Sequence, residues 1–576
     1  MLTADIIRTL LPAVLGLPVA AAIVLRLLDG PRARGAALAF SGLHLVLTVL
    51  IVFFGVMDIQ DDPNVGRSID RTKKQSERVF APQFVPGDPM PNGRHSYSTN
   101  WDVVPFYGTS AEGERTKLGA AQLFIGLDGL NVWLVALASF IMIPVVLFSW
   151  DSTREREGPF YSWLFFLQAG VLGVFLSFDL LLFYVCFELT LVPLLFLIGG
   201  WGPGPNRREA ARKLFLFTLA GGLITLLGVI GTVLFVYAQT GEPNKPGELT
   251  FSIPRLADIV QAKMNQTTAE PTRNLWLEAQ RYLFVALAVG FAVKIPVVPL
   301  HSWLPGAYAE APTGVTVMLS ALLAKMGTFG LVRICLPICP DATLSVGMPL
   351  LGILGTVGIV YGALCAYAQT DMRRLVAYSS VSHLGFCVLA IVAFSPAALA
   401  GGVLHMINHA LSTGAMFLLV GMLMRRYGTA QIPDYSGVWS RLPELTFFMM
   451  VVSLASIGLP GLNNFVSEML MLGGVFDVRS PYVNGTAFAV FAALGIFLSA
   501  WYTLTMIRRV FFGPPKEPPA VALVTDLTPR ERATIAPVAL LCLILGILPQ
   551  IALDVMYRDV SRLAQVGDEA RARAMK

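Results

Sequence analysis

Long apolar runs recur from one end of the chain to the other and restrict it to the interior of a membrane. Residues 131–150, 213–237, 347–367 and 483–506 are examples, and each run can cross about 30 Å of hydrocarbon as a helix. The chain of 576 residues is 55% hydrophobic and only 14% charged, which leaves no room for a large soluble catalytic domain. We therefore predict an all-α polytopic membrane protein.

Polar and Pro/Gly-rich breaks divide the apolar sequence into about fourteen predicted spanning helices. The first run is read as a span rather than a secretory signal, because a second apolar run follows at once. Two long polar segments, residues 57–122 and 239–281, are predicted to be loops. The approximate helix cores are 6–28, 36–56, 127–149, 160–177, 180–199, 213–238, 282–304, 313–337, 347–368, 373–395, 399–424, 445–475, 483–507 and 534–556.

Basic residues are divided unevenly between the two sets of short loops. The loops after odd-numbered helices carry them, for example Arg154, Arg156, Arg207 and Arg208, whereas the short loops on the other side carry almost none. Short basic loops stay in the cytoplasm, so both termini and both long polar segments are predicted to face away from it. The net charge of +5 is spread over many loops, which gives no support to nucleic acid binding.

Several ionisable residues lie inside the predicted spans. A charge at the bilayer centre costs about 2.5–3.5 kcal/mol on insertion scales, so each such residue is a functional candidate. Histidine titrates near neutrality and can pass protons. A purely structural role stays open for Glu188, and for the histidines relay and structural roles fit the spacing equally well. The candidates are Glu188, Lys294, Lys325, His383, His409 and Glu468.

Two of the predicted helices are interrupted beside a charged residue. Pro296 and Pro299 follow Lys294, and Pro460 with two glycines precedes Glu468. Proline removes a backbone donor and clashes with the preceding turn, and freed backbone groups at membrane depth are tolerated only within protein or along a water-filled cavity. Both breaks therefore predict a hydrated path, and their corresponding places in two halves indicate an inverted-repeat transporter.

Metal ligation has little support in the sequence. His405 and His409 are four residues apart on one helix face, but no third ligand is evident. The six cysteines mostly lie in apolar runs without a Cys-x-x-Cys pair, so they are expected to be packing residues. Only Cys335 and Cys339 leave a metal site or a cross-link open.

Six motifs follow one another along the chain. They are "FELTLVPLLFLIGGWG", "KIPVVPLHSWLPGAYAEAPT", "LLAKMGTFGLVR", "QTDMRRLVAYSSVSHLGF", "HALSTGAMFLLVGML" and "GLPGLNNFVSE". Together they resemble the antiporter-like proton-pumping subunits of respiratory complex I, and the resemblance runs from about residue 120 to residue 557. Within the family the chain is most similar to the chain M, or subunit-4, type, because Glu468 stands where the other two antiporter-like chains usually carry lysine.

The resemblance implies a division of the chain and a role for each candidate. Inverted repeats would span residues 160–338 and 339–510, after two helices and a long outer loop in 1–126 and a third helix in 127–159, and before a last helix and short tail in 511–576. The loop 57–122 is longer than usual in the family. The implied roles are a charged pair, Glu188 and Lys294; a central relay, Lys325; further relays, His383 and His409; an exit carboxylate, Glu468; and supporting residues, Lys213, His301 and His405.

The resemblance also implies that redox chemistry takes place in partner subunits. The chain has neither a dinucleotide fingerprint nor cluster ligands, so no cofactor or metal is expected in it, and NADH, FMN, iron–sulfur clusters and quinone are expected in the whole complex. Expected partners are the other membrane subunits, including neighbouring antiporter-like subunits, and the lipid of a bacterial inner membrane. The alternatives are a subunit of a sodium/proton antiporter, a subunit of a membrane-bound hydrogenase or formate-oxidising complex, and a structural scaffold.

Overall fold

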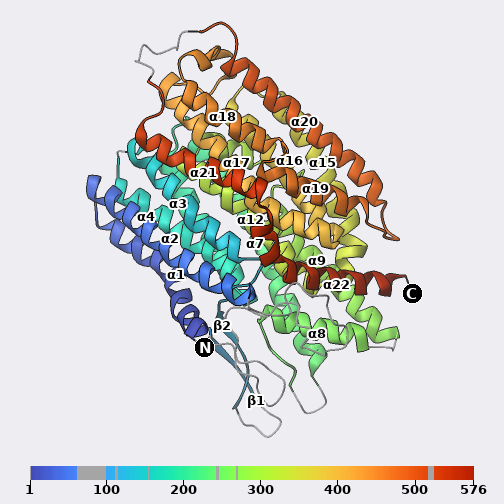
Figure 1. The fold of residues 1–576 in the computed structure, drawn as a ribbon. Helices are drawn as coiled ribbons and strands as arrows, with labels where there is room; N and C mark the ends of the chain where they lie inside the picture. The colour runs from blue at the N-terminus through green and yellow to red at the C-terminus, as the bar shows by residue number, and fades with distance from the viewer. Residues whose placement is uncertain are drawn as a thin grey trace.

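A bundle of long helices forms almost the whole molecule (Figure 1). The computed structural model describes residues 2–60, 99–109, 115–153, 155–241, 246–266, 270–516 and 525–575. In this part of the chain, twelve helices are long and apolar enough to cross a membrane, and a bent pair at the C-terminal end would make a thirteenth span. The prediction of an all-α polytopic membrane protein is confirmed.

The helices follow one another across the bundle, from α1 and α2 at one end to α15 and α20 at the other (Figure 1). The helix bounds are α1 (Leu2–Arg26), α2 (Gly30–Gln60), α3 (Val132–Ser152), α4 (Glu157–Leu176), α5 (Leu180–Leu189), α6 (Leu191–Trp201), α7 (Arg207–Thr240), α8 (Ile253–Gln266), α9 (Glu270–Lys294), α10 (Leu304–Glu310), α11 (Thr313–Met318), α12 (Ala324–Gly330), α13 (Leu336–Ile338), α14 (Pro340–Ala342), α15 (Met348–Tyr367), α16 (Met372–Ala393), α17 (Pro396–Tyr427), α18 (Pro443–Ser456), α19 (Asn463–Phe476), α20 (Gly485–Phe511), α21 (Pro529–Ile547) and α22 (Gln550–Ala574).

Both helix breaks predicted from the sequence are confirmed. Helix α9 ends at Lys294 itself, and the next regular helix, α10, begins at Leu304. The second break separates α18 from α19 just before Glu468. Gly458 and Gly461 in this break have φ angles of 72° and 90°, which residues other than glycine rarely adopt. Together α18 and α19 occupy the predicted helix 445–475, which brings the number of crossings close to the fourteen expected.

The span that carries Lys325 contains π-helical turns that could not be predicted from the sequence. Residues 313–338 form a single fully buried crossing. Two π-helical turns, η1 (Leu319–Leu323) and η2 (Leu331–Cys335), flank α12, so the lysine lies between two local widenings of the helix. Such π-turns occur frequently at functional sites.

Three elements correct the predicted loops. Strand β1 (Asn100–Thr109) pairs antiparallel with β2 (Arg115–Phe124), which begins in the segment 57–122 and ends two residues beyond it. Residues 61–98 and 110–114 of this segment lie outside the described part. Segment 239–281 contains α8 and the start of α9, so its prediction as a loop was wrong. Helix α8 buries one apolar face, including Ile253, Leu256 and Val260, and its polar face keeps the average hydropathy low.

The predicted short C-terminal tail was also wrong. The chain bends by 65° after α21 and continues as α22, which packs against α14 and α17. Helix α22 is amphipathic and therefore weak in a hydropathy scan. Arg573 pairs with Asp341 at 2.9 Å, and Arg571 donates to the carbonyl oxygens of Ala393 and Phe394. The hairpin, α8 and α22 all lie along the same edge of the bundle (Figure 1).

Asp179 joins the hairpin to the helical bundle. It lies between the spans that end at Leu176 and begin at Leu180. One carboxylate oxygen accepts hydrogen bonds from the N–H groups of Leu181 and Leu182 as the N-cap of α5, and the other accepts from the N–H of Gln122 on β2. Burial nevertheless raises the pKa of the Asp179 carboxyl to about 6, because it penalises the charged form more than these bonds favour it.

Replacement of Asp179 by asparagine should stabilise the protein at pH 7.5. A carboxyl whose folded-state pKa is raised contributes stability that is fully present below its unfolded pKa and is lost as the pH rises through about 6. Asparagine keeps the N-cap through Oδ1 and removes the charge, and it gives up only the hydrogen bond from the N–H of Gln122, because an amide nitrogen does not accept. In thermal melting of the purified protein, the difference in melting temperature between Asp179→Asn and the natural protein should be largest at pH 7.5 and shrink toward pH 5. A difference that does not change with pH would contradict this account. Asp179→Ala should be less stable than Asp179→Asn by about 1 kcal/mol, because alanine cannot cap the helix.

Candidate functional site

Lys294 is buried at the broken end of α9, with only 1% of its surface exposed. Its ammonium group donates a hydrogen bond to the carbonyl oxygen of Phe187, lies 3.4 Å from the hydroxyl of Thr190, and sits 3.4 Å above the centre of the Phe187 ring. These contacts come from the junction of α5 and α6, where the helix is itself interrupted at Thr190. The lysine thus bridges two irregular helices.

Glu188 lies on the same junction, next to Phe187. Both of its carboxylate oxygens are buried, and neither has a hydrogen-bond partner among the described residues. The carboxyl group packs over Gly222 of α7, where a Cβ would come within 2.1 Å of its Oε1. Its charge interacts with that of Lys294, although no ion pair joins the two in this part of the structure. The structure therefore places the two residues of the predicted pair near each other without an ion pair between them.

Lys325 is completely buried in the next span. Its Nζ lies 2.7 Å from Nδ1 of His409 and 2.5 Å from the carbonyl oxygen of Ser320. Helix α12 packs directly against the end of α9, since a Cβ on Gly327 would come within 2.6 Å of the Ile295 side chain. The helices that carry the two lysines are therefore neighbours.

Three histidines and Glu468 complete the polar row beyond Lys325. The ring of His383 on α16 lies 5.3 Å from that of His409 and 5.5 Å from that of His405, both on α17. Nδ1 of His383 lies 3.5 Å from Oε1 of Glu468 on α19. Nε2 of each histidine is buried without a hydrogen-bond partner among the described residues. Three helices thus bring their titratable groups to one place.

Uncharged polar side chains surround this row, and the sequence reading missed them. Ser467 lies 3.0 Å from Nδ1 of His405, and Asn408 donates to the carbonyl oxygen of Asn463. Asn463 in turn donates to the carbonyl oxygen of Asn408. These residues tie α17 to the start of α19. The signal in the sequence was the run "LNNFVSE", whose buried polar residues precede Glu468.

Ligand atoms of His383, His405 and Glu468 all lie within 4.8 Å of one another. The sequence showed no third ligand beside His405, because the partners come from separate helices. The set has the donor types of a zinc site, and the same atoms also suit proton exchange. Cys335 and Cys339, for which the sequence left a cross-link open, are both buried and free.

Two of the predicted supporting residues lie away from this row. Lys213 is exposed near the start of α7, with its ammonium group 5.9 Å from the ring centre of Phe217. Gly222, beside Glu188, is nine residues further along the same helix, or roughly 13 Å at 1.5 Å per residue. His301 lies in the break after α9 and packs edge-on against Tyr361 at 5.2 Å. His405, by contrast, is part of the histidine group.

A second buried charged group lies outside the predicted set. Arg333 forms a two-pronged ion pair with Asp128, and neither side chain is exposed. Asp128 also accepts hydrogen bonds from the N–H groups of Leu130 and Asn131. Asp559 of α22 accepts from the N–H of Gly129 next to it. This group fastens α22 to the start of α3 and to the span that carries Lys325.

Comparisons with known proteins agree on one family. Residues 177–495 match the family model described as NADH:quinone oxidoreductase/Mrp antiporter, TM. NADH-quinone oxidoreductase subunit M of Pseudomonas aeruginosa is 39% identical over 456 residues, which cover 78% of this chain and 83% of that protein. A chain of respiratory complex I from Thermus thermophilus is similar in structure, with a TM-score of 0.73, 26% identity, and coverage of 96% of this chain and 99% of that one. A chain of the Mrp complex from Dietzia shares the fold, with a TM-score of 0.70, 18% identity and 99% coverage of both chains.

Proposed function

The chain belongs to the NADH:quinone oxidoreductase/Mrp antiporter membrane family, and on this premise we propose that it is a proton-translocating membrane subunit of an NADH-quinone oxidoreductase. The observation that carries the proposal is the buried row from Lys325 through His409 and His383 to Glu468, with separations of 2.7 Å, 5.3 Å between ring centres, and 3.5 Å. Charged groups at membrane depth are costly and mark ion or proton pathways. Four neighbouring titratable groups on four packed helices, α12, α17, α16 and α19, support such a pathway.

Glu188 and Lys294 form the first part of the proposed path. A nearby carboxylate favours the protonated amine, whereas burial favours the neutral amine. If the two side chains approach and separate as the complex turns over, Lys294 takes up a proton in one state and releases it in the other. On this proposal, the separated arrangement, with Lys294 held by Phe187 and Thr190 rather than by Glu188, is one of these two states.

The redox chemistry belongs, on this proposal, to other subunits. The chain itself binds no cofactor, while NADH, FMN, iron–sulfur clusters and quinone are held elsewhere in the complex. Its partners are the neighbouring antiporter-like membrane subunits and lipid. We place it in a bacterial inner membrane with both termini on the periplasmic side, because the basic short loops then face the cytoplasm.

A sodium/proton antiporter subunit is the alternative with a specific observation in its favour. The Mrp chain has the same fold, but at 18% identity the similarity extends to the fold alone. The two functions differ in what drives the protons. Acidification of inverted vesicles on addition of NADH supports the present proposal, and a response to a sodium gradient without NADH supports the alternative.

Glu188→Ala and Lys294→Ala should each leave the complex assembled and abolish most NADH-driven proton pumping. Both side chains would hold or steer a proton, and alanine can do neither. Pumping is measured with a pH-sensitive dye in inverted membrane vesicles, alongside NADH oxidation and immunodetection of the assembled complex. Lys263→Ala, on α8 outside the spanning helices, is the matched control and should pump normally.

Two outcomes would count against this path. Normal pumping in either variant would remove that residue from the path. Loss of assembled complex in both variants, with Lys263→Ala assembled normally, would support the scaffold alternative instead.

A further inference from the structure

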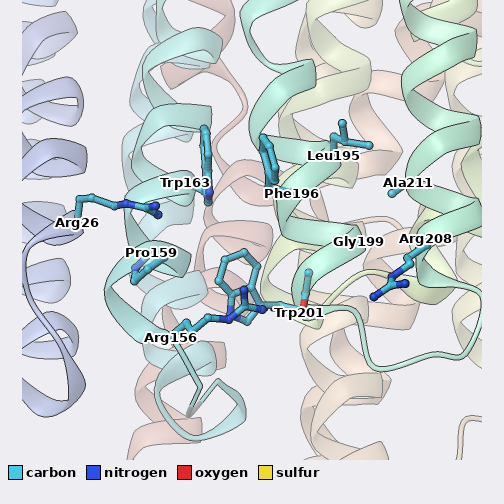
Figure 2. A pocket seen from close by; sticks show the side chains of 11 residues that line it. Arg26, Arg156, Pro159, Trp163, Leu195, Phe196, Gly199, Trp201, Arg208 and Ala211 are labelled. Atoms are coloured by element: carbon cyan, nitrogen blue, oxygen red, sulfur yellow. Dashed lines mark hydrogen bonds between the residues drawn. The ribbon is translucent and has the colours of Figure 1, made fainter.

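A pocket of about 580 Å³ opens where the ends of four helices meet, away from the proton path (Figure 2). The helices are α1, α4, α6 and α7, and the pocket lies at their basic ends. It is lined by Arg26, Arg156, Pro159, Trp163, Leu195, Phe196, Gly199, Gly200, Trp201, Arg208 and Ala211. No acidic side chain belongs to this lining.

Three arginines from separate elements supply its charge. Arg26 ends α1, Arg156 precedes α4, and Arg208 lies in the first turn of α7. Within the described residues, neither Arg26 nor Arg208 has a hydrogen bond or an ion pair, and all three side chains are exposed. Arg156 lies 4.7 Å above the ring of Trp201 and donates to the carbonyl oxygen of Gly200 at 3.4 Å. In Figure 2, Arg26 and Arg208 lie on opposite sides of the pocket, with Arg156 and Trp201 between them. Three positive charges in a lining that contains no carboxylate favour an anion.

Trp163 and Phe196 form an aromatic wall on one side of the pocket. Trp163 of α4 stacks on Phe196 of α6, with ring centres 4.9 Å apart and planes 12° apart. Phe196 is 48% exposed, and Val192 of α6 and Ile23 of α1 are also exposed. In a membrane this surface meets acyl chains. The pocket therefore combines a polar, positively charged end with an apolar side.

We propose that this pocket binds one anionic phospholipid. Its phosphate lies beside Arg156, with Arg26 and Arg208 adding positive charge on either side, and its acyl chains run along Trp163 and Phe196. Basic pockets between membrane helices on the cytoplasmic side bind the head groups of such lipids, and arginine pairs with phosphate through several parallel hydrogen bonds. A free phosphate ion would use the arginines but not the aromatic wall. A zwitterionic lipid also presents a phosphate, but its choline group carries a positive charge that the arginines repel.

The test uses the assembled complex and phosphatidylglycerol with a photoactivatable group in one acyl chain. After mild delipidation, the labelled lipid is added, activated and mapped by peptide mass spectrometry. We expect labels on the α4 and α6 peptides that contain Trp163 and Phe196, with competition from unlabelled phosphatidylglycerol but not from phosphatidylcholine or inorganic phosphate. The triple variant Arg26→Gln, Arg156→Gln, Arg208→Gln should lower the labelling at least about tenfold.

Arg508→Gln is the matched control, because Arg508 is exposed in the last turn of α20, at the other end of the bundle. It should leave the labelling unchanged. Equal labelling in the triple variant would overturn the proposal, as would equal competition by phosphatidylcholine, which indicates an apolar groove, or by inorganic phosphate, which indicates an anion site. Cross-links that run to a partner subunit instead of α4 and α6 would also overturn it, because another protein would then cover the pocket.

Discussion

Replacement of Lys325 by methionine is expected to reduce NADH-driven proton translocation at least tenfold while the complex still assembles. Lys325 is fully buried, and its Nζ lies 2.7 Å from Nδ1 of His409. Without the amine, a proton must cross this part of the membrane with no group to accept it. A charge at the bilayer centre costs about 2.5–3.5 kcal/mol, and each 1.36 kcal/mol added to a barrier slows a step about tenfold. The measurement is initial acidification of vesicles, normalised to assembled complex.

Leu322→Met provides the control for this variant. Leu322 is buried on the same span, three residues before the lysine, and exchange of leucine for methionine nearly conserves volume, so the packing cost stays below about 1.5 kcal/mol. It should pump normally. Normal pumping by Lys325→Met would remove the central step of the proposed path, whereas loss of pumping in both variants would point to packing instead.

Replacement of Arg333 by methionine is expected to lower the stability of the chain by about 3–5 kcal/mol, because it leaves Asp128 buried without its partner. Both side chains are inaccessible to solvent. The guanidinium also packs on the rings of Phe178 and Phe329, at 4.5 and 5.0 Å. The expected result is a large fall in the amount of chain in purified membranes and in the melting temperature of the complex that remains.

The double variant Asp128→Leu, Arg333→Met separates the buried charge from the packing. Apolar replacement of a complete buried ion pair is often neutral or stabilising, so the double variant should recover much of the stability that Arg333→Met loses. Some loss should persist, because Asp128 also accepts hydrogen bonds from the start of α3. A double variant as unstable as the sum of the two single variants would show that the two charges do not depend on each other.

The sequence was sufficient to predict which residues interrupt the spans. Proline and glycine act locally, so the breaks after Lys294 and before Glu468 could be read from the residues beside them. The proximity of His383, His409 and Glu468 could not be predicted in this way. These residues lie on α16, α17 and α19, and only the packing of the three helices brings the side chains together. The resemblance to a family supplied their roles, not their contacts.

Other features could not be predicted from the sequence for similar physical reasons. Arg333 belongs to the motif "LLAKMGTFGLVR". An arginine near the end of an apolar run resembles a residue at the membrane interface. Its partner Asp128 is 205 positions away in the sequence, so only the fold shows that the two form a buried pair. Helices α8 and α22 were missed because an amphipathic helix at a membrane edge has a low average hydropathy. The π-turns around Lys325 leave no mark in the residue types. The division into inverted repeats stays a prediction.

The central claim is that one hydrated path joins Lys294 to Glu468 through Lys325. A cryo-electron-microscopy map of the assembled complex in which ordered waters are visible tests it most directly. The account predicts a continuous chain of water and side chains from the broken end of α9, past Lys325 and the three histidines, to Glu468 at the start of α19. A dry apolar gap between Lys294 and Lys325, in a map that shows water on both sides of it, would contradict the claim.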